Sequence, residues 1–136
     1  MRITWLLLCA LLTVFAIGGC SSEDPSKYPE LSSSYEETSA DVGCGSKYSD
    51  DMKEDFFNRV FKNHWMTWRG TVVLASSDDA SLNLDGKGTQ DLQVEFADDH
   101  AGYFLEKGEV ITVRFVMKTM GGCILPFSGE YATILK

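Results

Sequence analysis

The chain has 136 residues, of which 44% are apolar and 12% aromatic, and 12 basic against 20 acidic side chains give a formal net charge of −8. This length fits one domain, and the aromatic content is too high for a disordered chain. The excess of acid argues against a protein that coats nucleic acid, because phosphate binding requires a basic face. We therefore do not expect nucleic acid as a partner.

The N-terminus has the pattern of an export signal. Arg2 is followed by an almost wholly apolar run over residues 3–17, which is too short for an ordinary membrane span of about 20 residues. The run ends in Ile17-Gly18-Gly19-Cys20, which resembles the lipobox of bacterial lipoproteins. The resemblance implies that residues 1–19 are removed and that Cys20 carries acyl chains such as palmitate, which anchor the protein in a membrane.

A plain secretory signal and a cytosolic N-terminal helix are the alternatives. Ser21 resembles the residue that sorts lipoproteins of Gram-negative bacteria to the outer membrane, where the protein would face the periplasm. Retention at the periplasmic face of the inner membrane is the alternative location. Without residues 1–19 the chain has 117 residues and a net charge of −9, because that segment holds one basic residue and no acid.

Residues 20–47 are predicted to be the lipidated cysteine followed by a flexible tether. They are rich in serine and acids and show no apolar periodicity, so they cannot bury enough surface to order themselves. A coil of 24 residues from Cys20 to Cys44 would span roughly 25–30 Å. The alternative is an ordered N-terminal arm, in which the domain is contacted by Tyr28, Leu31 and Tyr35.

Two cysteines remain once Cys9 is assigned to the signal and Cys20 to the lipid. Exported proteins mature in an oxidising compartment, so we predict a disulfide between Cys44 and Cys123. Closing a loop of about 80 residues stabilises the fold by roughly 4 kcal/mol in the chain-entropy treatment. A metal site or a reactive thiol is the alternative, although the chain has no Cys-x-x-Cys motif.

Asp50 to His64 is predicted to form the one helix that precedes the strands. Apolar residues repeat there at helical spacing and form one stripe, which comprises Met52, Phe56, Phe57, Val60 and Phe61. The N-cap candidates are Ser49, Asp50 and Asp51.

The apolar period then changes to two, which predicts five short strands over residues 66–75, 82–84, 92–96, 110–117 and 129–135. On the first strand we expect Trp68, Val72 and Leu74 to share one face. Gly70 would let this strand bend around a barrel corner. Many short strands joined by glycine-containing turns favour a sandwich or a small barrel.

Two of these segments resemble OB-fold sequences. Residues 68–73 (WRGTVV) look like the opening strand of bacterial OB-fold domains, and residues 105–113 (LEKGEVITV) look like the entry into their fourth strand. Together they resemble the tRNA_anti-like group of exported bacterial OB-fold proteins over about residues 50–136. The resemblance implies a mainly β fold, a five-stranded OB-like Greek-key barrel over residues 48–136 preceded by one amphipathic helix. The basic residues of an oligonucleotide-binding OB face are sparse here.

The candidate partner-binding face comprises Trp65, Trp68, Arg69 and Arg114. The odd spacing of the two tryptophans puts them on opposite faces of a strand, so one of them would be exposed. The two arginines alternate outward and would lie on the binding face of an OB barrel. The alternative is that the aromatic side chains fill the core and the arginines are solvated or ion-paired.

Two other patterns are weaker signals of chemistry. His100 follows Asp98 and Asp99, a set able to bind a divalent metal but typical of a polar surface loop. The segment 81–86 partly mimics a calcium loop, yet it lacks Asp at its first position and Glu at its twelfth. We expect no metal and no cofactor. The chain has no G-x-S-x-G motif, so we assign no catalytic residue and do not expect an enzyme.

The sequence therefore predicts a lipid-anchored, disulfide-linked binding module of the cell envelope that recognises a protein, a peptide or a glycan. The second hypothesis is an acidic inhibitor or immunity-type lipoprotein that masks a basic toxin or hydrolase. The third is an envelope hydrolase, because abundant carboxylates leave paired acid–base chemistry open.

Overall fold

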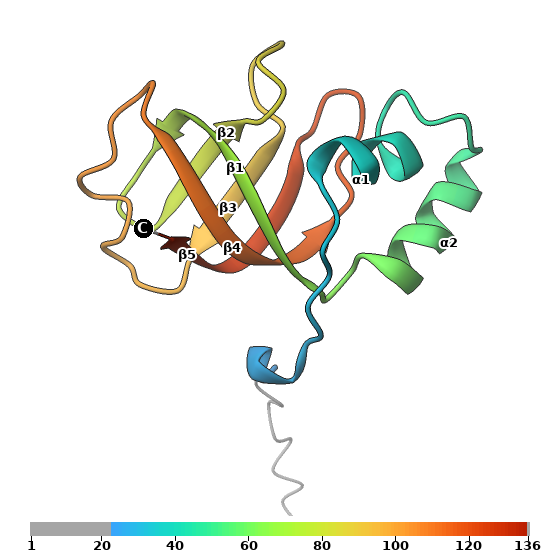
Figure 1. The fold of residues 1–136 in the computed structure, drawn as a ribbon, viewed down its shortest axis with the longest axis horizontal. Helices are drawn as coiled ribbons and strands as arrows, with labels where there is room; N and C mark the ends of the chain where they lie inside the picture. The colour runs from blue at the N-terminus through green and yellow to red at the C-terminus, as the bar shows by residue number, and fades with distance from the viewer. Residues whose placement is uncertain (1–22, 136) are drawn as a thin grey trace, which may run out of the picture.

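The computed structural model describes residues 23–135. The predicted signal over residues 1–19 and the predicted lipid acceptor Cys20 lie outside this range. Within this range, two α-helices and a short 3-10 helix precede five strands (Figure 1). In chain order the elements are η1 (Pro25–Lys27), α1 (Tyr35–Val42), α2 (Asp50–Val60), β1 (Trp65–Ala75), β2 (Asp79–Asn83), β3 (Leu92–Phe96), β4 (Val110–Thr119) and β5 (Phe127–Leu135).

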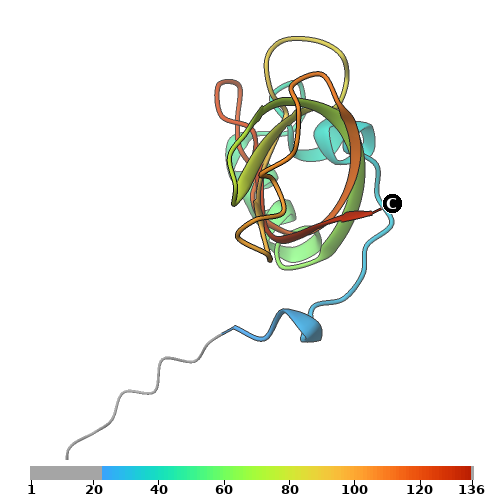
Figure 2. The same cartoon turned by 90° about the vertical axis from the view of Figure 1, so that its left-hand side faces the viewer.

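The five strands close into a barrel in the order β1-β2-β3-β5-β4, and β4 pairs with β1 to complete the ring. Seen from one end, the strands form an oval ring (Figure 2). All neighbouring strands are antiparallel except β3 and β5, which run parallel. This mainly β architecture confirms the predicted five-stranded OB-like barrel. The helices lie at one end of the barrel, and the β3–β4 loop lies at the other.

The barrel interior is filled mainly by alternate residues of the strands, as a half-buried sheet requires, although β2 and β4 each bury three residues in a row. On β3 the pattern is strict, because Gln93 and Glu95 face outward between three buried apolar residues. Gly129 faces inward, where a Cβ atom would collide with the ring of Phe115, so glycine is needed to make room for that ring. The fully buried side chains of the barrel include Met66, Val72, Leu82, Leu92, Val94, Val113, Phe115 and Met117.

The prediction that Leu74 shares a face with Trp68 and Val72 is wrong. The pairing of β1 with β2 shifts register between Val72 and Leu74, and this bulge turns Leu74 outward, where 67% of the residue is exposed. Gly70 lies upstream of the bulge, where a Cβ would press on the carbonyl of Asn83. Close approach of two strands therefore explains this glycine.

Helix α2 begins where the sequence predicts and ends earlier, at Val60 instead of His64. The Ser49 hydroxyl accepts a hydrogen bond from the Met52 amide and caps the N-terminus. The apolar stripe is narrower than predicted, because Met52 is 52% exposed while Phe57 is buried. The helix therefore packs against the rest of the molecule mainly through its C-terminal half.

The prediction of a flexible tether is wrong for residues 23–47, and the prediction of a single helix is wrong as well. This part of the chain contains η1 and α1, and it packs against the barrel. Ser34 and Glu37 form a reciprocal capping box at the start of α1, a pattern that is visible in the sequence as Ser-x-x-Glu. The alternative of an ordered N-terminal arm is the one the structure supports.

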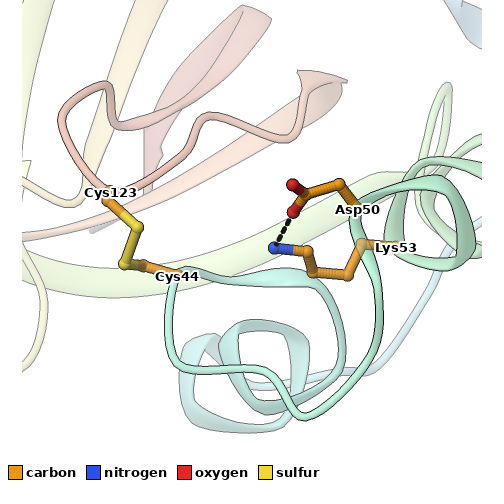
Figure 3. The surroundings of a disulfide bond; sticks show 4 residues. All are labelled: Cys44, Asp50, Lys53 and Cys123. Carbon is orange, nitrogen blue, oxygen red and sulfur yellow. Dashed lines mark ion pairs between the residues drawn. A yellow bond between two sulfur atoms is a disulfide. The ribbon is translucent and has the colours of Figure 1, made fainter.

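The predicted disulfide joins Cys44, which follows α1, to Cys123 in the β4–β5 loop (Figure 3). Its Cα atoms lie 4.7 Å apart, and the bridge closes a separation of 79 residues. Both cysteines are exposed. The bridge therefore fastens the N-terminal segment to the barrel from outside the core. Nearby on α2, the Lys53 ammonium lies 2.7 Å from Asp50 and lowers the pKa of that carboxyl.

Candidate functional site

Residues 23–34, which we call the strap, run across the outside of the barrel and cover Trp65. The Trp65 amide donates to the Pro29 carbonyl at 2.8 Å, and the Leu31 amide donates to the Trp65 carbonyl at 2.9 Å. The indole Nε1 of Trp65 donates to the Pro25 carbonyl at 3.0 Å. Only 8% of Trp65 remains exposed. The strap thus occupies the surface on which the sequence placed a partner.

Arg114 is also engaged by the strap. Its guanidinium lies 3.7 Å from the centre of the Trp65 ring and forms an ion pair with Glu30, in which Nε donates to Oε1 at 3.0 Å. A cation over an indole face contributes roughly 0.5–1 kcal/mol at an exposed site. Arg114 therefore links the barrel to the strap through its contacts with Trp65 and Glu30.

Trp68 lies inside the barrel, on the opposite face of β1 from Trp65. It packs edge-on against Tyr35, Phe115 and Phe127, and its Nε1 donates to the Ser33 carbonyl at 2.8 Å. The two tryptophans do lie on opposite faces of β1. However, the prediction that one of them is exposed is wrong, because the strap covers the outer one.

Arg69 is the only one of the four predicted face residues that is exposed. It borders an apolar groove of about 420 Å³ at the end of the barrel opposite the helices. The β3–β4 loop contributes Phe104, which is 87% exposed. A separate apolar tip, Ile124 and Leu125, lies beside the disulfide. The four predicted residues therefore do not form one free surface.

The start of the strap is held by Lys118 of β4. The Lys118 ammonium lies 2.6 Å from Glu23 and 3.7 Å from Glu130, and it lies near the rings of Tyr28 and Tyr131. The hydrogen bond from Lys118 lowers the pKa of Glu23. Burial lowers the pKa of Lys118, but the hydrogen bond with Glu23 and the charge of Glu130 outweigh it and raise that pKa.

The outer face of β2, β3 and β5 carries a depression of about 380 Å³ that we call the acidic depression. Its lining includes four carboxylates and no basic side chain; the carboxylates belong to Asp78, Asp79, Glu95 and Glu130. Asp79 and Glu95 are direct cross-strand neighbours. The depression includes residues of β2 and β3, the strands whose outer face binds ligands in OB-fold proteins, and it extends onto β5.

The pairing of Asp79 with Glu95 works against stability. Like charges directly opposite each other on two strands are destabilising. Within residues 23–135, no ion pair joins either carboxylate to a cation. The sequence places Glu95 at an outward position of its strand, but Asp79 lies outside the predicted second strand, and only the register of β2 against β3 brings the two together. Sequence reasoning therefore missed this pair.

The metal-like pattern at Asp98–His100 and the calcium-loop-like segment 81–86 both form ordinary turns. The Asp98 carboxylate accepts the amide of His100 at 2.9 Å, which is an ordinary turn contact. Asn83 and Asp85 accept the amides of Gly86 and Lys87, so these side chains hold their own turn together. Among the described residues, no group of three or more His, Cys, Asp or Glu side chains is placed to hold a metal ion.

No family model matches the chain, and no curated protein and no solved structure matches it significantly. No helix within residues 23–135 is long and apolar enough to cross a membrane.

Proposed function

We propose that this protein is a lipid-anchored binding module of the cell envelope that holds a basic segment of another protein in its acidic depression. Cys20 anchors it, and the barrel faces the periplasm at the outer membrane, with the inner membrane as the alternative location. The lipobox-like residues 17–20 and the disulfide Cys44–Cys123, which suits an oxidising compartment, support this placement.

The observation that carries the proposal is the direct opposition of Asp79 and Glu95 on the outer face of the barrel. The repulsion between these two carboxylates lowers stability, and the pair lies on the strands with which OB barrels bind their ligands. A cationic side chain placed between these carboxylates would relieve their repulsion. Phosphate groups would be repelled, so the same geometry argues against nucleic acid.

The acidic depression favours a protein or peptide over a glycan, because the charge of the site selects a cationic ligand. An inhibitor that masks a basic toxin or hydrolase would use the same surface, since its target is also a basic protein. We propose a binding role instead of catalysis, because the depression lies on an open sheet face that does not exclude water.

The binding test uses a fluorescent decalysine peptide as the probe and the mature chain as the receptor. We expect the double substitution Asp79→Asn with Glu95→Gln to weaken binding about tenfold, which corresponds to ~1.4 kcal/mol. The matched control is Asp51→Asn with Glu54→Gln on α2, which removes the same charge from another exposed surface. An equal loss in both variants would show that net charge alone attracts the probe, and would refute the site.

The anchor is tested separately in cells by labelling with palmitate and separating membranes. Cys20→Ala should abolish the label and leave the protein as an unprocessed precursor or as a soluble form. If the variant is still processed and retained in the membrane, the lipobox assignment is wrong.

A further inference from the structure

The strap leaves very little chain between the proposed anchor and the barrel. Three residue steps separate Cys20 from Glu23, the first described residue. A fully extended chain covers at most about 3.6 Å per residue, so Glu23 lies within about 11 Å of the anchored cysteine. A coil from Cys20 to Cys44 would have allowed more than twice that distance.

The strap is fastened to the barrel along its whole length. Glu23 is bound by Lys118, the Pro25 carbonyl by Trp65, and Glu30 by Arg114. The Ser33 carbonyl, near its end, accepts from Trp68. These contacts span separations of 35 to 95 residues in sequence, so each one ties the strap to a distant part of the chain. The described chain is therefore attached to the barrel from Glu23 onward.

The charges of the molecule are divided between two surfaces. Around residues 23–30 of the strap, four carboxylates and four cations gather, namely Glu23, Asp24, Glu30 and Glu130 with Lys27, Lys62, Arg114 and Lys118. This side has no formal net charge. The other described residues hold 16 acids and only six cations. An anionic bilayer therefore repels the strap side less than the rest of the described surface taken together.

The side chains near Glu23 also suit a lipid headgroup region. Tyr28 and Tyr131 flank the Lys118 ammonium, and Lys62 is exposed nearby. Tyrosine is enriched at bilayer interfaces, and lysine keeps its apolar stem on the protein while its ammonium reaches the headgroups.

We propose that the strap side of the barrel lies against the lipid bilayer, so that the protein binds only partners located at the same membrane. This inference rests on the proposed anchor at Cys20. Glu130 lines the acidic depression and also lies beside Lys118, so the depression borders the strap side. A basic segment close to the membrane surface reaches it, whereas one held far from that membrane does not.

Energy transfer on vesicles tests the proposal. The chain from Cys20 onward, with its disulfide intact, is coupled through the Cys20 thiol to a maleimide lipid in phosphatidylethanolamine–phosphatidylglycerol vesicles. Trp65 and Trp68 are its only tryptophans and serve as donors to dansyl-labelled headgroups. We expect strong transfer. A glycine–serine insertion of about 20 residues between Ser22 and Glu23, which adds roughly 25 Å of reach, should cut the transfer at least by half.

The matched control carries the same insertion between Gly86 and Lys87, in the exposed turn before β3. Its transfer should equal that of the parent chain. If the parent chain transfers no better than the variant with the N-terminal insertion, the barrel does not lie on the bilayer and the proposal fails. Because the anchor is imposed chemically, this failure is distinct from failure of lipidation in cells or of decalysine binding.

Discussion

The strap side and the acidic depression use charge in opposite ways. On the strap side, carboxylates are matched by nearby cations, and Arg114 packs on Trp65 while it pairs with Glu30. In the depression, Asp79 faces Glu95 directly. The first arrangement adds stability to the fold and the second reduces it. This difference is the basis of our proposal that the depression binds a ligand, whereas the strap side attaches the N-terminal segment to the barrel.

The largest expected effect comes from the disulfide, which secures the segment that follows the strap and α1. Reduction, or the double substitution Cys44→Ser with Cys123→Ser, should lower the free energy of unfolding by about 4 kcal/mol, because it releases a loop of 79 residues in the unfolded chain. Urea unfolding measures this. An unchanged midpoint would show that the bridge does not form in solution.

Trp65→Ala should produce the next largest loss, about 3 kcal/mol, because it removes a buried indole together with its contacts to Arg114 and the Pro25 carbonyl. Thr67→Ala is the control, since Thr67 is exposed further along β1, and it should change stability by less than about 0.5 kcal/mol. Equal losses from both substitutions would mean that the strap does not cover Trp65. The unfolding free energy of both variants gives the answer.

Alkaline pH should weaken the link between α1 and the barrel. Burial and the hydrogen bond to Asp91 raise the pKa of Tyr35 to about 12, above the ordinary value of 10.0. The raised pKa means that the folded state keeps its proton longer than the unfolded state. The protonated Tyr35 hydroxyl therefore makes its full contribution to the free energy of unfolding below pH 10. This contribution is lost as pH rises towards 12.

Because Tyr35 is partly exposed, we expect a loss on the order of 1 kcal/mol. The measurement compares the stability of the parent chain and Tyr35→Phe from pH 9 to 12. Since other tyrosines titrate in both proteins, only the difference between the two curves reports on Tyr35. If that difference does not change with pH, the Tyr35–Asp91 contact has no energetic role.

The smallest expected effect is a gain in the free energy of unfolding instead of a loss. Asp79→Asn should stabilise the fold by a few tenths of a kcal/mol, because it removes the repulsion with Glu95 across β2 and β3. Glu36→Gln, at an exposed position of α1, removes the same charge elsewhere and controls for net charge. Thermal unfolding of the two variants measures the difference. Destabilisation by Asp79→Asn would contradict the contrast between the two surfaces.

Local patterns predicted the regular elements well. Alternation located β3 at residues 92–96, and the helix start at Asp50 followed from its cap and apolar stripe. The bulge that turns Leu74 outward has no such local signal, since it arises where β1 meets β2. The start of β2 at Asp79 was also missed, because its alternation there depends on Ala80, a small apolar residue that is depleted in strands.

The candidate sites were predicted less well than the strands. The four predicted face residues were chosen for their outward or aromatic character, yet three of them contact the strap and only Arg69 is exposed. The capping box at Ser34 was a readable sign of order in that region. The sequence did not predict that this region packs against the barrel, because its serine- and acid-rich composition resembles that of a disordered segment.

The amino-acid sequence by itself determined the alternation of the strands and the cap of α2, because each depends on residue type and short spacing. Only the tertiary structure decided that Glu30 meets Arg114, 84 residues away, and that Asp79 faces Glu95. Both depend on how distant segments pair and pack. For the same physical reason, composition showed the acid excess but could not show that four of the carboxylates line one depression.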